Sequence, residues 1–234
     1  MDSRLRPYII RFGFYGVYRI GHITLDWGLI TSLVERWRPE THTFHLPVGE
    51  MTITLQDVVV ILGLCIHGLP VTGTCDIDWS LLCYELLGVT PPTYEIRGSA
   101  ISTRWLCHHF SHPPVDLDDA TLERYARAFI LGLIGSTLFT NKKGTHIHRC
   151  YLPLLRDLTR TSMYSWGSAV LARLYRELCR ASLYGATNIA GCVTLLQLWS
   201  WERLHVGRPH FGQLLALPVA QHLEHDATDD LPVE

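Results

Sequence analysis

Lysine is almost absent from this sequence. Only Lys142 and Lys143 are lysines, so the other 18 of the 20 basic residues are arginines. An enzyme that uses pyridoxal phosphate needs a lysine that forms a Schiff base inside a shielded pocket. These two lysines are adjacent in a stretch, Asn141–Gly144, that is typical of an exposed turn between helices. The sequence therefore argues against transaminase chemistry, and we predict no bound cofactor.

The glycine-containing motifs of several enzyme classes are also missing. No glycine is followed by aspartate or asparagine, whereas metal-dependent phosphatases hold their metals on Gly-Asp and Gly-Asn-His-Glu loops. The sequence contains no Gly-x-Ser-x-Gly turn of an α/β-hydrolase and no glycine-rich phosphate loop. We therefore predict no catalytic residues, and an enzyme with an unrecognised site is the least favoured interpretation.

Paired metal ligands are scarce. The seven cysteines are odd in number and show no paired spacing, which is typical of free thiols in a reducing compartment. A composite zinc site would need the fold to gather His108, His112, His146 and His148, because zinc takes four nitrogen or sulfur ligands. Scattered structural histidines are the better interpretation, and no metal site is predicted.

The sequence shows no export signal and no membrane-spanning run. Met1–Arg4 begin no signal peptide, because no apolar segment follows them. The longest apolar run near a helix, Ala128–Phe139, is shorter than the roughly 20 residues that a membrane span needs. A net charge of −2 argues against bulk attraction to nucleic acid. We therefore expect a location in the cytoplasm or nucleus, no membrane association, and no support from charge for nucleic-acid binding.

The chain does contain enough apolar material for one globular domain, since 47% of its 234 residues are hydrophobic. Apolar residues recur mostly at helical spacing, so we predict a mainly α fold. We expect a single helical domain over residues 1–217, with one small β-hairpin at about Thr43–Ile53, and a loose acidic tail over residues 218–234. Caps and glycine or proline stops predict a helix between Thr24 and Pro39, then Asp78–Leu87, Ser102–Phe110, Asp118–Phe139, Tyr151–Leu158, Ser168–Ala181 and Gly191–His205.

The stretch Thr41–Gly73, THTFHLPVGEMTITLQDVVVILGLCIHGLPVTG, is the most informative segment. Extended formers around Phe44 lead into a tight turn, in which Pro47 fixes one φ angle and Gly49 is free to take a positive one. After Glu50 the chain returns as a second strand, so the segment begins with a hairpin.

A capped helix follows this hairpin. Thr54 is expected to cap the helix, and Asp57, three residues later, reaches back to the N–H of the cap. Gly63 and Gly68 are places for the helix and the next loop to stop. The segment offers no obvious nucleophile, base or metal ligand, so its distinctive residues are predicted to be structural.

As a string of residues, Thr41–Gly73 closely resembles the plant mobile domain. That domain is found in Maintenance-of-Meristems-like proteins, in plant transposons, and fused to long-form serine/threonine phosphatases, and is often labelled "aminotransferase-like". Leu5–Glu40, LRPYIIRFGFYGVYRIGHITLDWGLITSLVERWRPE, and Leu195–Pro209, LLQLWSWERLHVGRP, resemble the same family. The family's domain usually continues well past the last block, whereas this chain ends in HLEHDATDDLPVE, so we expect a shortened copy.

The resemblance implies a non-catalytic interaction module of the nucleus, linked to meristem maintenance, genome stability and silencing of transposons. Its implied partners are proteins, such as a phosphatase-like protein or another plant mobile domain protein. A transposon-encoded protein with DNA-directed function is the alternative, and salt-dependent DNA binding would distinguish it. An enzyme would instead show a deep pocket with convergent titratable groups.

Two features are candidates for a binding surface. Arg173, Arg176 and Arg180 share one face of a predicted helix, where they either meet phosphates or an acidic partner or form the solvated face of an amphipathic helix. Trp199 and Trp201 lie about 200° apart around a helix, so one is expected in the core while the other packs on a neighbour or anchors a partner. Core positions are the preferred interpretation for both.

Overall fold

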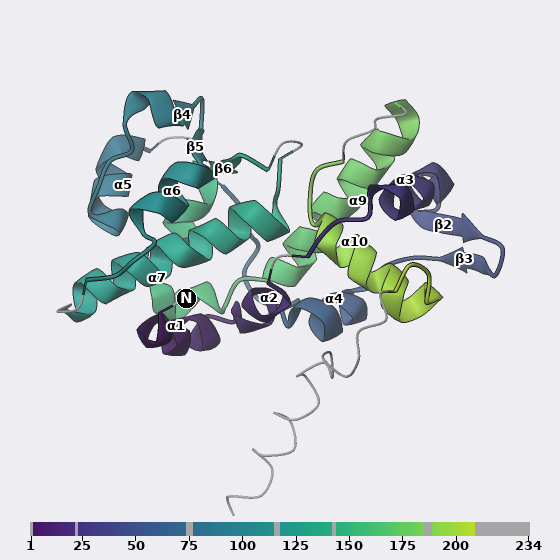
Figure 1. The fold of residues 1–234 in the computed structure, drawn as a ribbon, viewed down its shortest axis with the longest axis horizontal. Coiled ribbons are helices and arrows are strands. Elements are labelled where there is room, and N and C mark those ends of the chain that lie inside the picture. The colour runs from purple at the N-terminus through teal and green to yellow at the C-terminus, as the bar shows by residue number, and fades with distance from the viewer. Residues whose placement is uncertain are drawn as a thin grey trace, which may run out of the picture.

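The computed structural model of the chain describes residues 2–21, 23–73, 77–114, 118–141, 144–184 and 189–208. Over these residues the fold is mainly α, as the sequence predicts, with two small antiparallel sheets among the helices (Figure 1). One hydrophobic core takes in residues from Leu5 to Trp199. The predicted tail over residues 218–234 lies outside the described residues, as do Lys142 and Lys143.

Helices make up most of the described chain. In chain order they are η1 (Ser3–Leu5), α1 (Arg6–Arg11), α2 (Tyr15–Ile20), α3 (Trp27–Arg36), α4 (Leu55–Leu62), α5 (Trp79–Leu87), η2 (Thr93–Glu95), α6 (Thr103–His109), α7 (Asp119–Leu133), η3 (Ile134–Leu138), η4 (Arg149–Leu155), α8 (Leu158–Thr161), α9 (Trp166–Tyr184), α10 (Val193–Trp199) and η5 (Ser200–Leu204). The elements η3 and η5 are π-helical turns that continue α7 and α10, and the other η elements are 3-10 turns.

Most helices begin where the capping residues predict. Asp78, Ser102 and Asp118 each accept a backbone N–H from the first turn of α5, α6 and α7. The helix predicted at Tyr151–Leu158 is wrong in form, because η4 and the short α8 occupy this region. Pro153 lies inside η4, and a proline lacks the N–H that a continuous α-helix requires at that position.

The predicted cap at Thr24 is also wrong. Helix α3 is capped by Asp26, whose carboxylate accepts the N–H of Leu29 at 3.0 Å. The side chain of Gln197 donates to the carbonyl of Thr24 at 3.0 Å and accepts the N–H of Asp26 at 2.7 Å. This contact from α10 occupies the carbonyl of Thr24 and the N–H of Asp26, so the helix begins later than local sequence indicates.

The predicted hairpin is confirmed and forms part of a three-stranded sheet. Its strands are β1 (Trp37–Arg38), β2 (Thr43–Leu46) and β3 (Gly49–Met51), in the antiparallel order β1-β2-β3. Strands β2 and β3 are joined by a turn of Pro47 and Val48. Strand β1 was not predicted, because it continues directly from α3 and has no turn of its own before it.

A second small sheet was not predicted at all. It consists of β4 (Ile96–Arg97), β5 (Ala100–Ser102) and β6 (His146–His148), and β5 pairs with both neighbours. Ile101 lies opposite Ile147, and both side chains are buried. Strands this short show no alternation of apolar and polar residues in sequence, and β6 joins the sheet from beyond α6 and α7.

The helices form two groups, which lie on the left and right of Figure 1. Helix α7 packs against α1, α5 and α6, whereas α9 packs against α3, α4 and β1. Helix α2 contacts both α1 and α4 and therefore links the groups. A Cβ at Gly16 of α2 would lie 2.3 Å from the carbonyl oxygen of Leu62, so only glycine permits this close approach.

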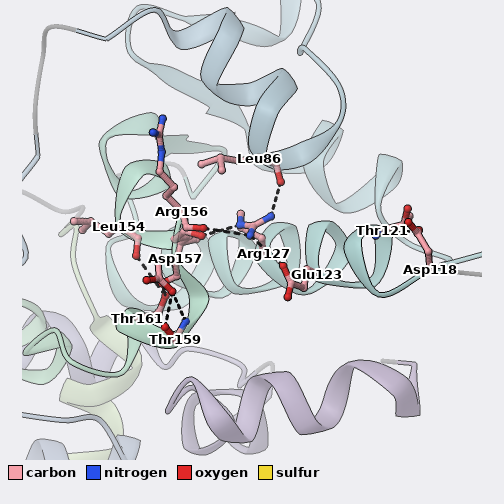
Figure 2. A network of polar contacts seen from close by, with 11 residues as sticks. Leu86, Asp118, Thr121, Glu123, Arg127, Leu154, Arg156, Asp157, Thr159 and Thr161 are labelled. Atoms are coloured by element: carbon pink, nitrogen blue, oxygen red, sulfur yellow. Dashed lines mark hydrogen bonds and ion pairs between the residues drawn. The ribbon is translucent and has the colours of Figure 1, made fainter.

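Arg127 of α7 joins α5 to η4 from within the core (Figure 2). Its Nε donates to the carbonyl of Leu155 at 2.7 Å, and its Nη1 donates to the carbonyl of Leu86 at 2.8 Å. These carbonyls belong to the last turns of η4 and α5, where backbone acceptors have no helical partner. Glu123, one turn earlier in α7, lies 3.8 Å from the guanidinium. Burial lowers the pKa of Arg127, and the carbonyls and Glu123 compensate its charge.

Candidate functional site

The Thr41–Gly73 segment is organised around the start of α4. Thr54 Oγ1 accepts the N–H of Asp57 at 3.3 Å, and Asp57 Oδ2 accepts the N–H of Thr54 at 2.8 Å, which confirms the predicted reciprocal cap. The remaining oxygen of Asp57, Oδ1, accepts the Nε–H of Arg203 at 2.8 Å and also pairs with its Nη2. One buried carboxylate thus joins α4 to η5, and with it two of the blocks singled out in the sequence.

Hydrogen bonds outweigh burial in setting the pKa of the Asp57 carboxyl group. Burial by itself would raise the pKa of this carboxyl, whereas the N–H and hydroxyl of Thr54 and the guanidinium of Arg203 lower it below its ordinary value of 3.8. Asp57 is therefore a carboxylate at neutral pH, with both oxygens engaged inside the protein. It is suited to holding structure and poorly suited to proton transfer.

A cluster of aromatic rings joins the same blocks. The ring centroid of Trp37 lies 4.8 Å from that of Phe44 and 5.1 Å from that of Tyr175, and Phe44 lies 5.2 Å from Trp199. The Tyr175 hydroxyl donates to the carbonyl of Ile53 at 2.6 Å, just before α4 begins. Trp37, Phe44 and Trp199 are all buried. Phe44 is therefore a core residue that anchors the hairpin.

The tip of the hairpin is exposed and held by side-chain pairs. Glu50 Oε1 lies 3.0 Å from Nε2 of His45 on the opposite strand, and Glu50 Oε2 accepts a hydrogen bond from the hydroxyl of Thr43 at 3.2 Å. Gly49 takes a φ of 121°, the positive value expected of it, and Val48 in the turn is exposed. Glu50 and Gly49 therefore serve the turn geometry.

The end of the segment is fastened to the start of α9. Gly63 ends α4 in the left-handed conformation, with a φ of 65°. Gly68 has a φ of 107°, and a Cβ there would lie 2.1 Å from the carbonyl oxygen of Met163. The same carbonyl accepts the N–H of Leu69 at 2.8 Å, and Leu69 accepts the N–H of Ser165 at 2.8 Å. Gly63 ends the helix as the sequence predicts, whereas Gly68 permits a close backbone approach to Met163 that the sequence did not indicate.

Both tryptophans of the last block are buried. Trp199 is 1% exposed and Trp201 is 7% exposed. Helix α10, which carries Trp199, packs against both α3 and α4. The preferred core interpretation is confirmed, and neither ring offers an exposed anchor for a partner.

The predicted arginine face lies on α9 and is partly neutralised. Glu177 is almost completely buried beside it, 3.1 Å from the guanidinium of Arg173 and 3.5 Å from that of Arg180. Arg176 is exposed and makes no ion pair with any residue that the structure describes. The face is therefore part of the packing of α9 at Arg173 and open to solvent at Arg176 and Arg180.

One surface recess among the described residues is apolar. It has a volume of about 490 Å³, within the range of roughly 300–1,000 Å³ that is usual for binding pockets. Its wall contains one histidine and one cysteine, and no carboxylate, lysine or arginine. The lining residues are Phe12, Gly13, Val59, Gly63, Leu64, Cys65, Ile66, His67, Ser162 and Trp166. Such a wall suits apolar contacts and does not bring together the paired titratable groups of an acid–base site.

The histidines considered for a zinc site are held separately. His148 Nε2 lies 2.6 Å from the hydroxyl of Ser99, and His146 Nδ1 lies 2.8 Å from that of Thr145. Among the described residues, no three His, Cys, Asp or Glu side chains are placed to hold a metal ion. Within the residues that the structure describes, no helix is long and apolar enough to cross a membrane.

Sequence reasoning missed Arg203, Gln197 and Arg127, which make the polar contacts between helices. Gln197 is completely buried and Arg127 is nearly so. The available signal was a polar residue among apolar residues at helical spacing. That pattern does not identify the hydrogen-bond partner of the polar residue.

Comparison with known proteins places this geometry in a wider context. The sequence profile described as "Plant mobile domain" matches residues 13–228. A serine/threonine-protein phosphatase 7 long form homolog from Arabidopsis thaliana is 53% identical over 209 residues, which is 89% of this chain and 16% of that protein. No solved structure matches the chain.

Two further relatives come from the same plant. Protein MAIN-LIKE 2 is 45% identical, over 87% of this chain and 30% of its own length. Protein MAINTENANCE OF MERISTEMS is 42% identical, over 83% of this chain and 41% of its own length. The chain thus spans less than half the length of each of these relatives.

Proposed function

The chain belongs to the plant mobile domain family. We propose that it acts as a non-catalytic, nuclear interaction module that binds other proteins. The partner is a phosphatase-like protein or another plant mobile domain protein. The module contributes to meristem maintenance, genome stability and silencing of transposons. The names of its relatives support the developmental part of this proposal.

The proposal rests on the structural role of the Asp57 carboxylate. This is the only buried charged residue of the Thr41–Gly73 segment within the described part of the chain, and both of its oxygens bind inside the protein. A catalytic segment would direct such a group into a pocket. Here the most distinctive stretch builds scaffold, and the recess lined by Phe12, Val59 and Trp166 is apolar, as suits contact with a partner.

The test is affinity capture from plant nuclei, with the full-length gene product as bait and mass spectrometry as readout. We expect enrichment of a plant mobile domain protein or a phosphatase-like protein, confirmed by direct binding of the purified pair. The bait variant Ile61→Ala removes part of a core side chain, because Ile61 is only 7% exposed. This variant is expected to lose the partner at the temperatures at which it unfolds.

Two results would contradict the proposal. One is a bait that enriches no such protein while the purified chain shifts DNA in a salt-dependent manner, which would favour the transposon-encoded alternative. The other is reproducible turnover of a phosphoester or amino-acid substrate by the purified chain.

A further inference from the structure

The arginine face of α9 carries more positive charge than its acidic neighbours neutralise. Arg173, Arg176 and Arg180 extend over about 10 Å of one side of the helix. A single carboxylate, that of Glu177, is shared by Arg173 at 3.1 Å and Arg180 at 3.5 Å. The side chain of Arg180 is 58% exposed, and Arg176 is exposed without an ion pair to any described residue. The face therefore has guanidinium groups free to bind an anion.

We infer that Arg173, Arg176 and Arg180 of α9 form a docking surface for an acidic segment of a partner protein. This inference rests on the proposed function and assigns a surface and a partner chemistry to it. Guanidinium groups bind carboxylates through paired N–H donors, so a short Asp- or Glu-rich segment has the geometry that this face accepts.

The charges favour an acidic protein segment over nucleic acid. The chain as a whole has a net charge of −2, whereas domains that bind DNA by its backbone are usually strongly basic. A nucleic-acid backbone is a long polyanion and would be repelled beyond the arginine face. A short acidic segment requires positive charge only at the face itself.

The test measures binding of a fluorescein-labelled peptide of ten glutamates to the purified chain by fluorescence anisotropy, at low and moderate salt. The double variant Arg176→Glu/Arg180→Glu is expected to weaken binding by about tenfold or more, because it reverses two exposed charges. The control variant Arg11→Glu/Arg19→Glu makes the same change in net charge, but on α1 and α2. Its affinity for the peptide is expected to stay within about twofold of that of wild type. Circular dichroism melting confirms that both variants are folded.

Three outcomes would overturn the inference: no binding of the peptide, equal losses in both double variants, or tighter binding of a ten-nucleotide single-stranded DNA than of the peptide. Capture of the nuclear partner separates this inference from the proposed function. A partner that binds wild type and Arg176→Glu/Arg180→Glu equally well would leave the interaction module intact and remove the arginine surface from it. Peptide binding by a chain that captures no partner would contradict the proposed function instead.

Discussion

Asp57 serves two neighbours at once. Its Oδ2 completes the cap of α4 with Thr54, and its Oδ1 binds Arg203 of η5. The carboxylate is almost completely buried, whereas the side chain of Arg203 is 49% exposed. Loss of Asp57 therefore removes a helix cap and a charged hydrogen bond together, but leaves an arginine that can turn into water.

Replacement of Asp57 by alanine is expected to lower the free energy of unfolding by about 2–5 kcal/mol. A lost cap accounts for about 0.5–2 kcal/mol and the bonds to a charged partner for about 1.5–3 kcal/mol. Chemical denaturation gives the value, and Thr54→Ala, which removes only the cap hydroxyl, is expected to cost about 1 kcal/mol. Equal losses in the two variants would mean that Arg203 contributes nothing.

The same carboxylate makes stability depend on pH. The pKa of Asp57 is lower in the folded protein than its ordinary value of 3.8, so the unfolded chain binds the proton more readily. The stabilisation is therefore complete above about pH 5 and is lost as pH falls through the folded pKa.

Asp57→Asn is accordingly expected to be less stable than wild type at pH 7 and to show a shallower loss of stability between about pH 5 and pH 3. Denaturant midpoints across this range measure both quantities. Parallel curves for the two proteins would contradict the assignment of this acid sensitivity to Asp57.

At the scale of elements, close backbone contacts decide how segments meet. The loop after α4 runs beside the start of α9, where Leu69 and Tyr164 form a parallel bridge. Gly68 permits this approach through its φ of 107° and its lack of a side chain. The junction therefore depends on one glycine as well as on hydrogen bonds.

Gly68→Ala is expected to destabilise the protein by at least about 2 kcal/mol, because it adds left-handed strain and a clash with the carbonyl of Met163. Gly132→Ala in α7 is the matched control, since a Cβ at Gly132 meets nothing within 4 Å. The control is expected to be neutral or to stabilise by up to about 1 kcal/mol. Thermal melting compares the two, and a neutral Gly68→Ala would show that the loop can move away.

At the scale of the whole molecule, buried polar side chains hold the helices in register. Arg127 links α7 to the ends of α5 and η4, as Figure 2 shows, and Gln197 links α10 to the start of α3. Each side chain satisfies backbone groups that no regular helix bond reaches. Apolar contacts alone would tolerate small shifts between helices, whereas these bonds specify one arrangement.

Arg127→Met is expected to cost about 3–5 kcal/mol, because the carbonyls of Leu86 and Leu155 would remain buried without donors. Arg127→Lys is expected to fall between this variant and wild type, since an ammonium group cannot reach both carbonyls with the same geometry. Arg124→Met, an exposed arginine of the same helix, is expected to stay within about 0.5 kcal/mol of wild type. Denaturant unfolding measures the series, and equal effects at both positions would contradict a specific role for Arg127.

The local features of this protein follow from short stretches of its sequence. The mainly helical class, the hairpin, the Thr54–Asp57 cap and the starts of α5, α6 and α7 depend on residues within one turn of each other. Their physical causes, such as a carboxylate near free N–H groups or a glycine with positive φ, are present in a short stretch of chain. Long literal strings also identified the family.

How distant groups meet depends on the packing of the whole fold. The start of α3 at Asp26, the second sheet, the bond from Arg203 to Asp57 and the placing of both tryptophans in the core each involve partners far apart in the chain. A sequence shows that such a residue is polar or apolar, but not which group will lie opposite it. That choice follows from the packing of whole helices, because a buried donor or ring is stabilised only by the neighbour that the fold brings to it.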